Sequence, residues 1–307
     1  MKVFNWIFIS FIIVGVIGGI VALSIYRFDF SSVWADMTNI PGYTQTEKRF
    51  DLEDVSDKIT INLRNESLIV RTSSDSDEVV ISYWYRNNDD TAYTVEEYEL
   101  AFTIDRNRNA RNWFQGLRGG NIRQHRVYIT IPQDFDSILH IQNHNGSMRV
   151  YGNNLDLESF RAINHNGSIR VYGLTAEQTI YTRTNNGSIR INDATVTDPD
   201  GIIESRTSNG SIRITRSEAN YVVTRSNNGS VRIDRGTFQN VDSRTSNGSN
   251  RIEIIGDQAD YTITFQTRNG SNRLNGSRVS SGTRGTGPNP IHIESRNGSN
   301  RLSFRSA

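Results

Sequence analysis

The sequence predicts an all-β fold: a single-chain β-solenoid (β-helix) of about 20-residue coils, preceded by one N-terminal transmembrane helix. Three observations predict it: a short motif that occurs eight times, a composition rich in Asn, Ser, Thr, Gly and Arg, and an uncharged apolar stretch near the amino terminus. A repeat period near 20 residues indicates stacked coils, each too small to bury its own apolar face alone.

The motif reads Asn-Gly-Ser, one variable residue, Arg, then Val, Ile or Leu, and successive copies are 21, 20, 23, 19, 19, 22 and 28 residues apart. Asn-Gly is typical of tight turns, because both residues tolerate positive backbone φ angles. In stacked coils each Asn amide could also hydrogen-bond to its copy one coil away, so we expect a structural role. These turn asparagines are Asn145, Asn166, Asn186, Asn209, Asn228, Asn247, Asn269 and Asn297.

Strand alternation predicts which side chains point inward. The residues six before and five after each motif Asn are apolar in all eight copies, so both positions should face the core. Small polar residues four and two before the Asn share this parity, as in Thr182 and Thr184. The inward position three after the Asn becomes Asn250, Asn272 and Asn300 in the last copies, which predicts a second asparagine ladder.

Residues 1–27 are expected to form a transmembrane anchor. Between Lys2 and Arg27 lie 24 uncharged residues, enough for a helix to cross a hydrocarbon core of about 30 Å. A cleaved signal peptide is the alternative, but it has a shorter apolar region and ends in a small-x-small site, and no Ala-x-Ala is present. Lys2 and the terminal amine favour an inside amino end, which would place the remainder outside the cytoplasm.

The rest of the chain is expected to contain three parts. Residues 28–57 form a stalk or linker, residues 58–140 an N-terminal irregular β-strand region, and residues 141–307 the regular β-solenoid repeats. Within 58–140, Asn65-Glu66-Ser67 resembles a degenerate first repeat. Further strands are expected at 79–85, 93–104 and 126–131, and the Gly, Ser and Pro-rich stretch between Asn275 and Pro290 is expected to be a loop.

The repeated motif and the segment Val127-Tyr128-Ile129-Thr130-Ile131-Pro132 together resemble the DUF4097 family of β-strand-repeat proteins, also labelled as adhesins. The resemblance covers roughly residues 46–307. It implies a fold similar to single-stranded β-helices, often behind a membrane anchor or signal sequence. It supplies no catalytic residues to carry over.

Charge suggests where a ligand would bind. Residues 141–307 contain 20 arginines, no lysine and 14 acidic residues, a local net charge of +6. Two arginine columns should point outward and could bind an acidic polymer, with copies about 4.8 Å apart. Four residues after the motif Asn are Arg149, Arg170, Arg190, Arg213, Arg232, Arg251, Arg273 and Arg301; three residues before it are Arg183, Arg206, Arg225 and Arg244.

The partner that we expect for these columns is an anionic glycan or wall polymer, and we do not expect nucleic acid. In the alternative interpretation, the arginine stems only cover the outer pleat, while acids such as Asp234 and Glu253 neutralise them.

No motif predicts catalysis. The sequence contains no G-x-S-x-G, no phosphate-binding loop and no zinc spacing, and its acids are scattered among variable positions. His144 and His165 occupy equivalent positions in adjacent copies, but no carboxylate recurs beside them, so we expect no metal site. Cysteine is absent. We therefore expect no enzyme and no cofactor.

The sequence thus predicts a membrane-anchored, extracytoplasmic surface protein: an adhesin-like, non-catalytic binding or structural rod. Two alternatives stay open. A self-assembling structural scaffold could form through a strand edge left after the last coil, close to Ala307. An envelope signalling or stress-response partner could bind another membrane protein through the basic segment from Arg106 to Arg126, which contains Trp113 and Phe114.

Overall fold

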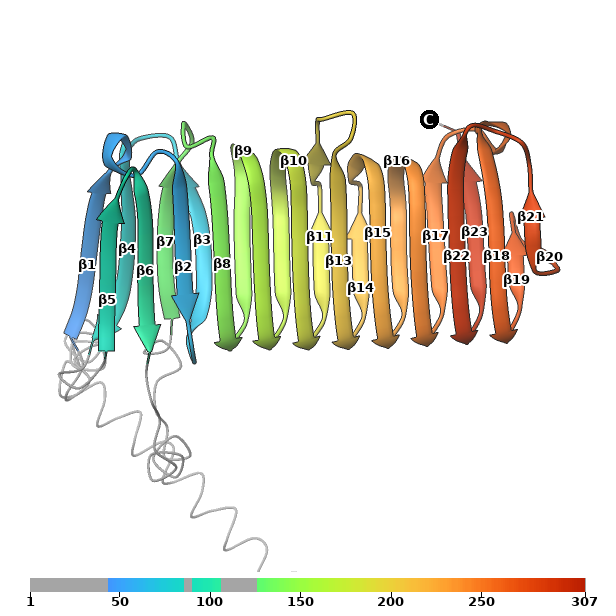
Figure 1. Cartoon of the computed structure of the whole chain (residues 1–307), viewed down its shortest axis with the longest axis horizontal. Coiled ribbons are helices and arrows are strands. Elements are labelled where there is room, and N and C mark those ends of the chain that lie inside the picture. The colour runs from blue at the N-terminus through green and yellow to red at the C-terminus, as the bar shows by residue number, and fades with distance from the viewer. Residues whose placement is uncertain (1–43, 86–89, 106–125, 307) are drawn as a thin grey trace, which may run out of the picture. The chain divides into compact units, whose positions relative to one another are not determined.

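The computed structural model describes residues 44–85, 90–105 and 126–306, and these are almost entirely β-strands (Figure 1). The all-β prediction is confirmed. Within the described ranges, no helix combines the length and the apolar character that a membrane crossing requires. The predicted anchor, residues 28–43 of the predicted linker and most of the Arg106–Arg126 segment lie outside these ranges.

Face A is the sheet whose strands run toward the motif asparagines. Its neighbouring strands are parallel, and equivalent residues of successive coils lie side by side. In spatial order it contains β6 (Glu99–Asp105), β2 (Lys58–Leu63), β8 (Ile138–Asn145), the second parts of β9 (Met148–Asn166) and β10 (Ile169–Asn186), β13 (Ile202–Asn209), the second parts of β15 (Glu218–Asn228) and β16 (Val231–Asn247), β22 (Asn289–Asn297) and β18 (Tyr261–Asn269).

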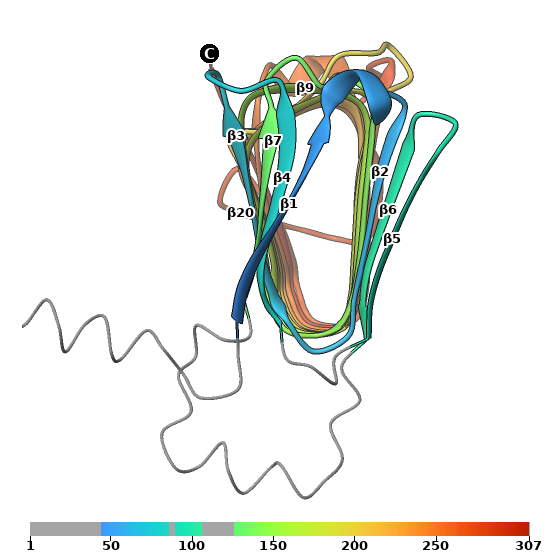
Figure 2. The same ribbon diagram turned by 90° about the vertical axis from the view of Figure 1, so that its left-hand side faces the viewer.

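Face B is the sheet formed by the strands that follow the motif, and it is also parallel between coils. In spatial order it contains β7 (Arg126–Pro132), β3 (Ser67–Ser73), the first parts of β9 and β10, β11 (Ile189–Asn192), β14 (Ile212–Thr215), the first part of β16, β17 (Asn250–Ile255), β23 (Asn300–Arg305) and β19 (Asn272–Leu274). Viewed along the stack, faces A and B run side by side and meet at the motif turn (Figure 2). A short strand, β12 (Thr195–Val196), lies between the end of face B and the start of face A.

Antiparallel strands cover both ends of the stack. At one end β5 (Asp90–Glu96) pairs with β6, β4 (Glu78–Tyr85) pairs with β7, and β1 (Thr44–Asp51) pairs with β4. At the other end β21 (Gly282–Arg284) pairs with β18, and β20 (Ser277–Val279) pairs with β19. Two 3-10 turns, η1 (Leu52–Asp54) and η4 (Gln258–Asp260), complete the described elements.

In three segments of the chain the elements differ from those that the sequence predicts. The single strand expected at 93–104 is two strands, because Glu97 and Tyr98 adopt positive φ angles and turn the chain back. The stretch expected to be a loop between Asn275 and Pro290 contains β20 and β21. The strand β1 and the turn η1 lie within the range expected to be a linker.

The order of the coils in space differs from their order in the sequence at both ends. The coil β22–β23, last in the sequence, lies between β16–β17 and β18–β19. At the other end β2–β3 lies between β6–β7 and β8–β9. The last coil of the sequence, which we expected to leave a free strand edge, is therefore inside the stack. The coil β18–β19 lies near this end instead, and it pairs with β21 and β20.

The predicted inward positions are confirmed. Apolar residues such as Phe160, Phe238 and Ile263 are buried, and so are Thr182 and Thr184. The polar residue two before the motif Asn is inside because it donates a hydrogen bond to a carbonyl of a neighbouring turn, as Thr184 Oγ1 does to Gly167 at 2.9 Å. Its buried hydroxyl is therefore satisfied.

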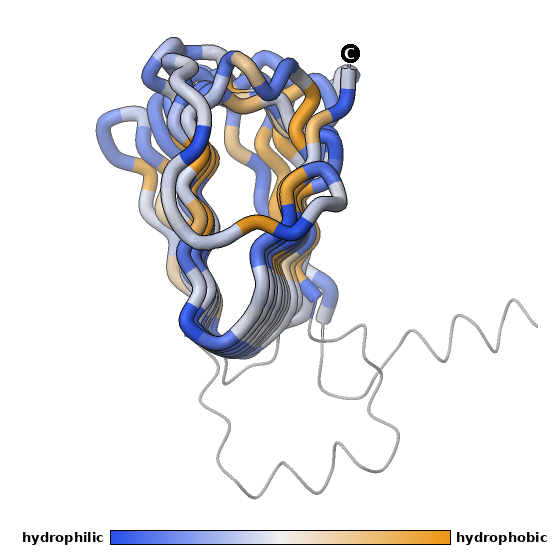
Figure 3. Tube along the Cα trace, turned by 90° about the vertical axis from the view of Figure 1, so that its right-hand side faces the viewer, coloured by the Kyte–Doolittle hydropathy of each residue, from blue (hydrophilic) through white to orange (hydrophobic). Residues whose placement is uncertain are grey.

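Both asparagine ladders are confirmed. Along the turns, from Asn65 of the degenerate repeat to Asn269, each Nδ2 donates to the Oδ1 of the preceding coil in the stack at 2.7 to 2.9 Å. In the core, Asn250 donates to Asn300 and Asn300 to Asn272, both at 2.9 Å. Figure 3 shows the hydrophilic turns aligned along one side of the stack.

The motif glycine is required for a reason other than the one that we predicted. Only Gly146 and Gly167 among the eight have a φ in the left-handed region. Instead, a Cβ on any of the eight would lie only 1.7 to 2.2 Å from a backbone carbonyl oxygen of the neighbouring turn. Glycine is there because the coils approach each other closely at this turn.

Candidate functional site

The candidate site is built on the face B arginine column. Strand pairing places Arg149, Arg170, Arg190, Arg213 and Arg232 side by side in five successive coils. Arg251, Arg301 and Arg273 continue the column in that order. None of the eight side chains is buried. The predicted outward column therefore exists, with Arg301 placed inside it by the interleaved last coil.

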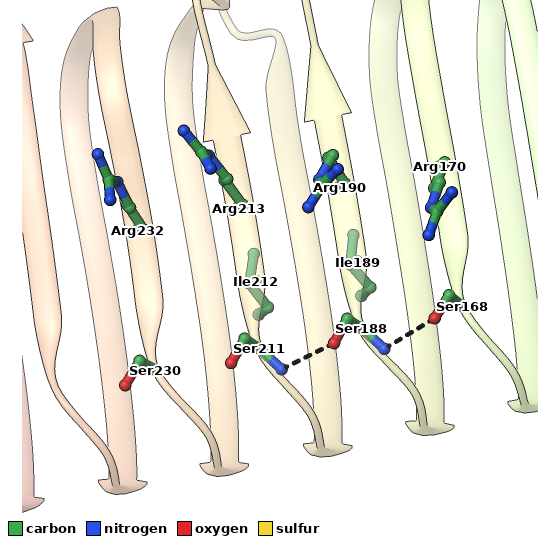
Figure 4. Close-up of a pocket in the computed structure, with 10 residues that line it drawn as sticks. All are labelled: Ser168, Arg170, Ser188, Ile189, Arg190, Ser211, Ile212, Arg213, Ser230 and Arg232. Carbon is green, nitrogen blue, oxygen red and sulfur yellow. Dashed lines mark hydrogen bonds between the residues drawn. The ribbon is translucent and has the colours of Figure 1, made fainter.

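A column of motif serines forms the opposite wall of a groove. Ser168, Ser188, Ser211 and Ser230 run parallel to Arg170, Arg190, Arg213 and Arg232, with Ile189 and Ile212 between them (Figure 4). The groove has a volume of about 280 Å³.

The serine hydroxyls are oriented by the backbone of the neighbouring coil. Ser188 N–H donates to Ser168 Oγ, and Ser211 N–H donates to Ser188 Oγ, both at 3.4 Å (Figure 4). Each Oγ that accepts this bond keeps its own O–H hydrogen for another acceptor. Both walls of the groove therefore present hydrogen-bond donors, and only an electron-rich ligand can accept from them all.

Acidic side chains compensate the column unevenly. Asp234 pairs with Arg213 at 3.0 Å and with Arg232 at 2.7 Å. Arg149, Arg170 and Arg190 have no ion pair with any residue that the structure describes, and Glu253, which we expected to neutralise the column, likewise forms none there. Arg251, Arg301 and Arg273 also have no ion pair in the described part of the chain, so positive charge is uncompensated in the first three and the last three coils of the column.

The face A column has a different environment. Arg183, Arg206, Arg225 and Arg244 lie side by side as predicted. Arg206 pairs with Glu204, Arg225 pairs with Asp242, and Arg244 contacts both Asp242 at 2.9 Å and Glu294 at 3.8 Å. The core separates this column from the groove on face B, so the two columns do not form one basic stripe.

The two histidines of adjacent coils stack on each other. The rings of His144 and His165 are 4.6 Å apart and nearly parallel, at 9°. Their nitrogen lone pairs lie in the ring planes, so two stacked rings do not direct them at a common point. In the described ranges, no three His, Cys, Asp or Glu residues form a metal-binding group.

The marked pKa shifts lie outside the groove. Arg216 donates to Asp193 at 2.5 and 2.6 Å and holds the pKa of that carboxyl below its ordinary value. Burial, together with the positive charges of Arg161 and Lys58, lowers the pKa of His140. The groove itself is lined by Arg, Ser and Ile.

The serine wall was missed by the sequence analysis. The signal was present, since the motif Ser lies two residues before the motif Arg in every copy and therefore points to the same side of a strand. We interpreted it only as part of the turn.

A family model described as Toastrack DUF4097 matches residues 56–301. Comparison with curated protein sequences gives no match. Similar solved structures include a "putative cell adhesion protein" from Clostridium sporogenes (9% identity, 86% of this chain and 100% of that chain, TM-score 0.34). They also include "putative adhesin" structures from Bacteroides fragilis (15%, 85% and 97%, 0.46) and Parabacteroides merdae (9%, 85% and 96%, 0.25).

Proposed function

Because the chain belongs to the DUF4097 Toastrack family, we propose that its stacked coils form a rigid β-solenoid whose role is binding and not catalysis. In this proposal the protein is a membrane-anchored, extracytoplasmic, adhesin-like rod, and its ligand is a linear anionic polymer. The single observation that carries the proposal is the groove on face B, with serine hydroxyls on one wall and arginines on the other.

The shape and the charge of the groove support a polymer over a small ligand. The groove is open along the stack and repeats the same donors in each coil, so a chain of repeated anionic units can meet the same contacts several times. Arginine suits this task because its planar fork donates two hydrogen bonds to a carboxylate, sulfate or phosphate. An anionic glycan or wall polymer fits these requirements.

The disposition of the carboxylates supports binding over catalysis. Asp234, Asp242 and Glu204, all on the outer faces, are engaged by arginines. Hydrolysis of a glycan would need two carboxylates facing one sugar bond. Paired in this way, these acids have a structural role.

The groove predicts a variant with reduced affinity for a polyanion. Arg170→Gln with Arg190→Gln should weaken the binding of labelled heparin at least ~10-fold at about 0.15 M salt, because two uncompensated cations are lost. The slope of log affinity against log salt should decrease by about 2. Fluorescence anisotropy on the detergent-solubilised full chain measures both quantities.

The matched control removes two arginines from the opposite face. Arg206→Gln with Arg244→Gln changes the net charge by the same amount, but these side chains are paired with acids. We expect this control to lose less than ~3-fold in affinity. Equal losses in the two variants would mean that only net charge matters, and the groove would then have no special role.

The proposed location has its own test. With an epitope added after Ala307, protease treatment of intact cells should remove the epitope signal, because the proposed topology places the coils outside the cytoplasm. A cytoplasmic protein of the same cells serves as the lysis control. Protection of the epitope until lysis would contradict the extracytoplasmic location.

A further inference from the structure

A third column of side chains extends the groove on face B. Two residues after the column arginines lie Tyr151, Tyr172, Asn192, Thr215 and Asp234, side by side in five successive coils. Tyr151, Tyr172 and Asn192 are partly exposed neutral hydrogen-bonding residues, Thr215 is buried, and Asp234 is acidic. The chemistry beside the arginine column therefore changes along the stack.

Asp234 weakens the attraction for anions in one part of the groove. Its carboxylate contacts Arg213 and Arg232, the arginines of the fourth and fifth coils. An anionic ligand there would have to compete with this carboxylate and would be repelled by it. The first three coils, which contain Arg149, Arg170 and Arg190, have no acid paired with their arginines in the described ranges. The arginines of the last three coils are likewise unpaired there, but they do not line the groove.

The same three coils carry Tyr151, Tyr172 and Asn192. The two phenol rings stack with their centroids 5.3 Å apart and their planes at 11°. Both tyrosines are partly exposed, and neither hydroxyl has a hydrogen-bond partner in the described ranges. A phenol or an amide both donates and accepts hydrogen bonds, so this column suits neutral hydroxyl groups, whereas the arginines suit anions.

The arginine column and the column of Tyr151, Tyr172 and Asn192 together restrict the chemical class of the ligand. Its repeating unit must present an anion to the arginines and hydroxyl groups to the tyrosines and Asn192. Inorganic polyphosphate has no sugar hydroxyls along its chain. Single-stranded nucleic acids bind by stacking their bases on aromatic faces, but the facing surfaces of Tyr151 and Tyr172 are occupied by each other.

We propose that these three coils form a subsite for a linear acidic glycan. The carboxylates of successive sugars contact Arg149, Arg170 and Arg190, and the ring hydroxyls contact Tyr151, Tyr172 and Asn192. This inference rests on the proposed function, because it names the class of anionic polymer that the groove binds.

The test measures the affinity of a double variant for two polymers, oligogalacturonate and inorganic polyphosphate. Tyr151→Phe with Tyr172→Phe keeps the stacked rings and removes only the hydroxyls. It should weaken binding of the full chain to oligogalacturonate by about tenfold, since two hydrogen bonds are lost, and change its affinity for inorganic polyphosphate by less than ~2-fold. Tyr181→Phe with Tyr221→Phe on face A is the matched control and should change neither affinity.

The outcomes separate this inference from the proposed function. If the wild-type chain binds oligogalacturonate and polyphosphate equally and the Tyr151 and Tyr172 variant alters neither, the glycan subsite is wrong while anion binding in the groove stands. Equal affinity for single-stranded DNA, lost in the same variant, would also overturn the glycan assignment. If the wild-type chain binds none of these polymers, the proposed function fails as well.

Discussion

Replacing Gly210 with Ala is expected to lower the free energy of unfolding by about 3 kcal/mol or more. The added Cβ would lie 1.9 Å from the carbonyl oxygen of Gly187 in the neighbouring coil. That oxygen cannot move freely, because it accepts a hydrogen bond from Thr207 Oγ1 at 3.0 Å. The two turns would have to separate, which would strain the bond from Gly187 N–H to the Asn209 carbonyl at 3.1 Å.

Urea denaturation followed by circular dichroism measures this loss, and Gly276→Ala is the control. Gly276 has a φ of 85°, so alanine is disfavoured there by its backbone angle, but no atom lies within 4 Å of the added Cβ. We expect the control to cost about 1 kcal/mol. Similar losses in the two variants would show that close approach between coils is not the reason for glycine at the turn.

The second large effect is expected at the buried asparagine ladder. Asn300 is fully buried, accepts from Asn250 Nδ2 and donates to Asn272 Oδ1, both at 2.9 Å. Asn300→Val removes these two bonds and a third, from Asn300 Nδ2 to the Gln266 carbonyl at 2.8 Å, and leaves each partner one hydrogen bond short. We expect a loss of about 3 kcal/mol in the free energy of unfolding, because an unsatisfied buried group costs more than a hydrogen bond contributes.

The triple substitution of Asn250, Asn272 and Asn300 by Val tests that reasoning. It removes the ladder partners together, and the same inward position is Ile212 or Val231 in other coils. Ser243 and the carbonyls of Glu294 and Gln266 still lose a partner, so we expect the triple variant to lose stability, but less than the sum of the three single losses. Thermal unfolding of the three single variants and of the triple variant measures these losses. A loss in the triple variant equal to the sum of the three single losses would contradict the proposed coupling.

Much of the fold could be predicted because strand alternation is a local property. The inward Thr182 and Thr184, the outward arginines and both asparagine ladders all follow from counting positions from the motif. The neighbour of each coil could not be predicted in this way. Asn247 could pair equally well with Asn269 or with Asn297, because both carry the same amide. The motif therefore sets the register of two coils but not which coils are neighbours. The chain that connects the coils determines that choice.

The candidate site was predictable in part. The Arg149 to Arg273 column follows from the repeat, but its electrostatics depend on which acid reaches which arginine. Asp234 contacts two arginines while Glu253 contacts none within the described residues, although both occupy the same position after their motif. Side-chain reach across coils is a three-dimensional property that spacing along the chain does not encode.

The interleaved position of the last coil has a consequence for how the molecule is made. A ribosome synthesises β22 and β23 after the two coils between which they lie. Coils β16–β17 and β18–β19 therefore cannot both reach their final neighbours until residues 289–305 have been released. A product terminated before residue 289 would lack an interior coil and not the coil at the end of the stack.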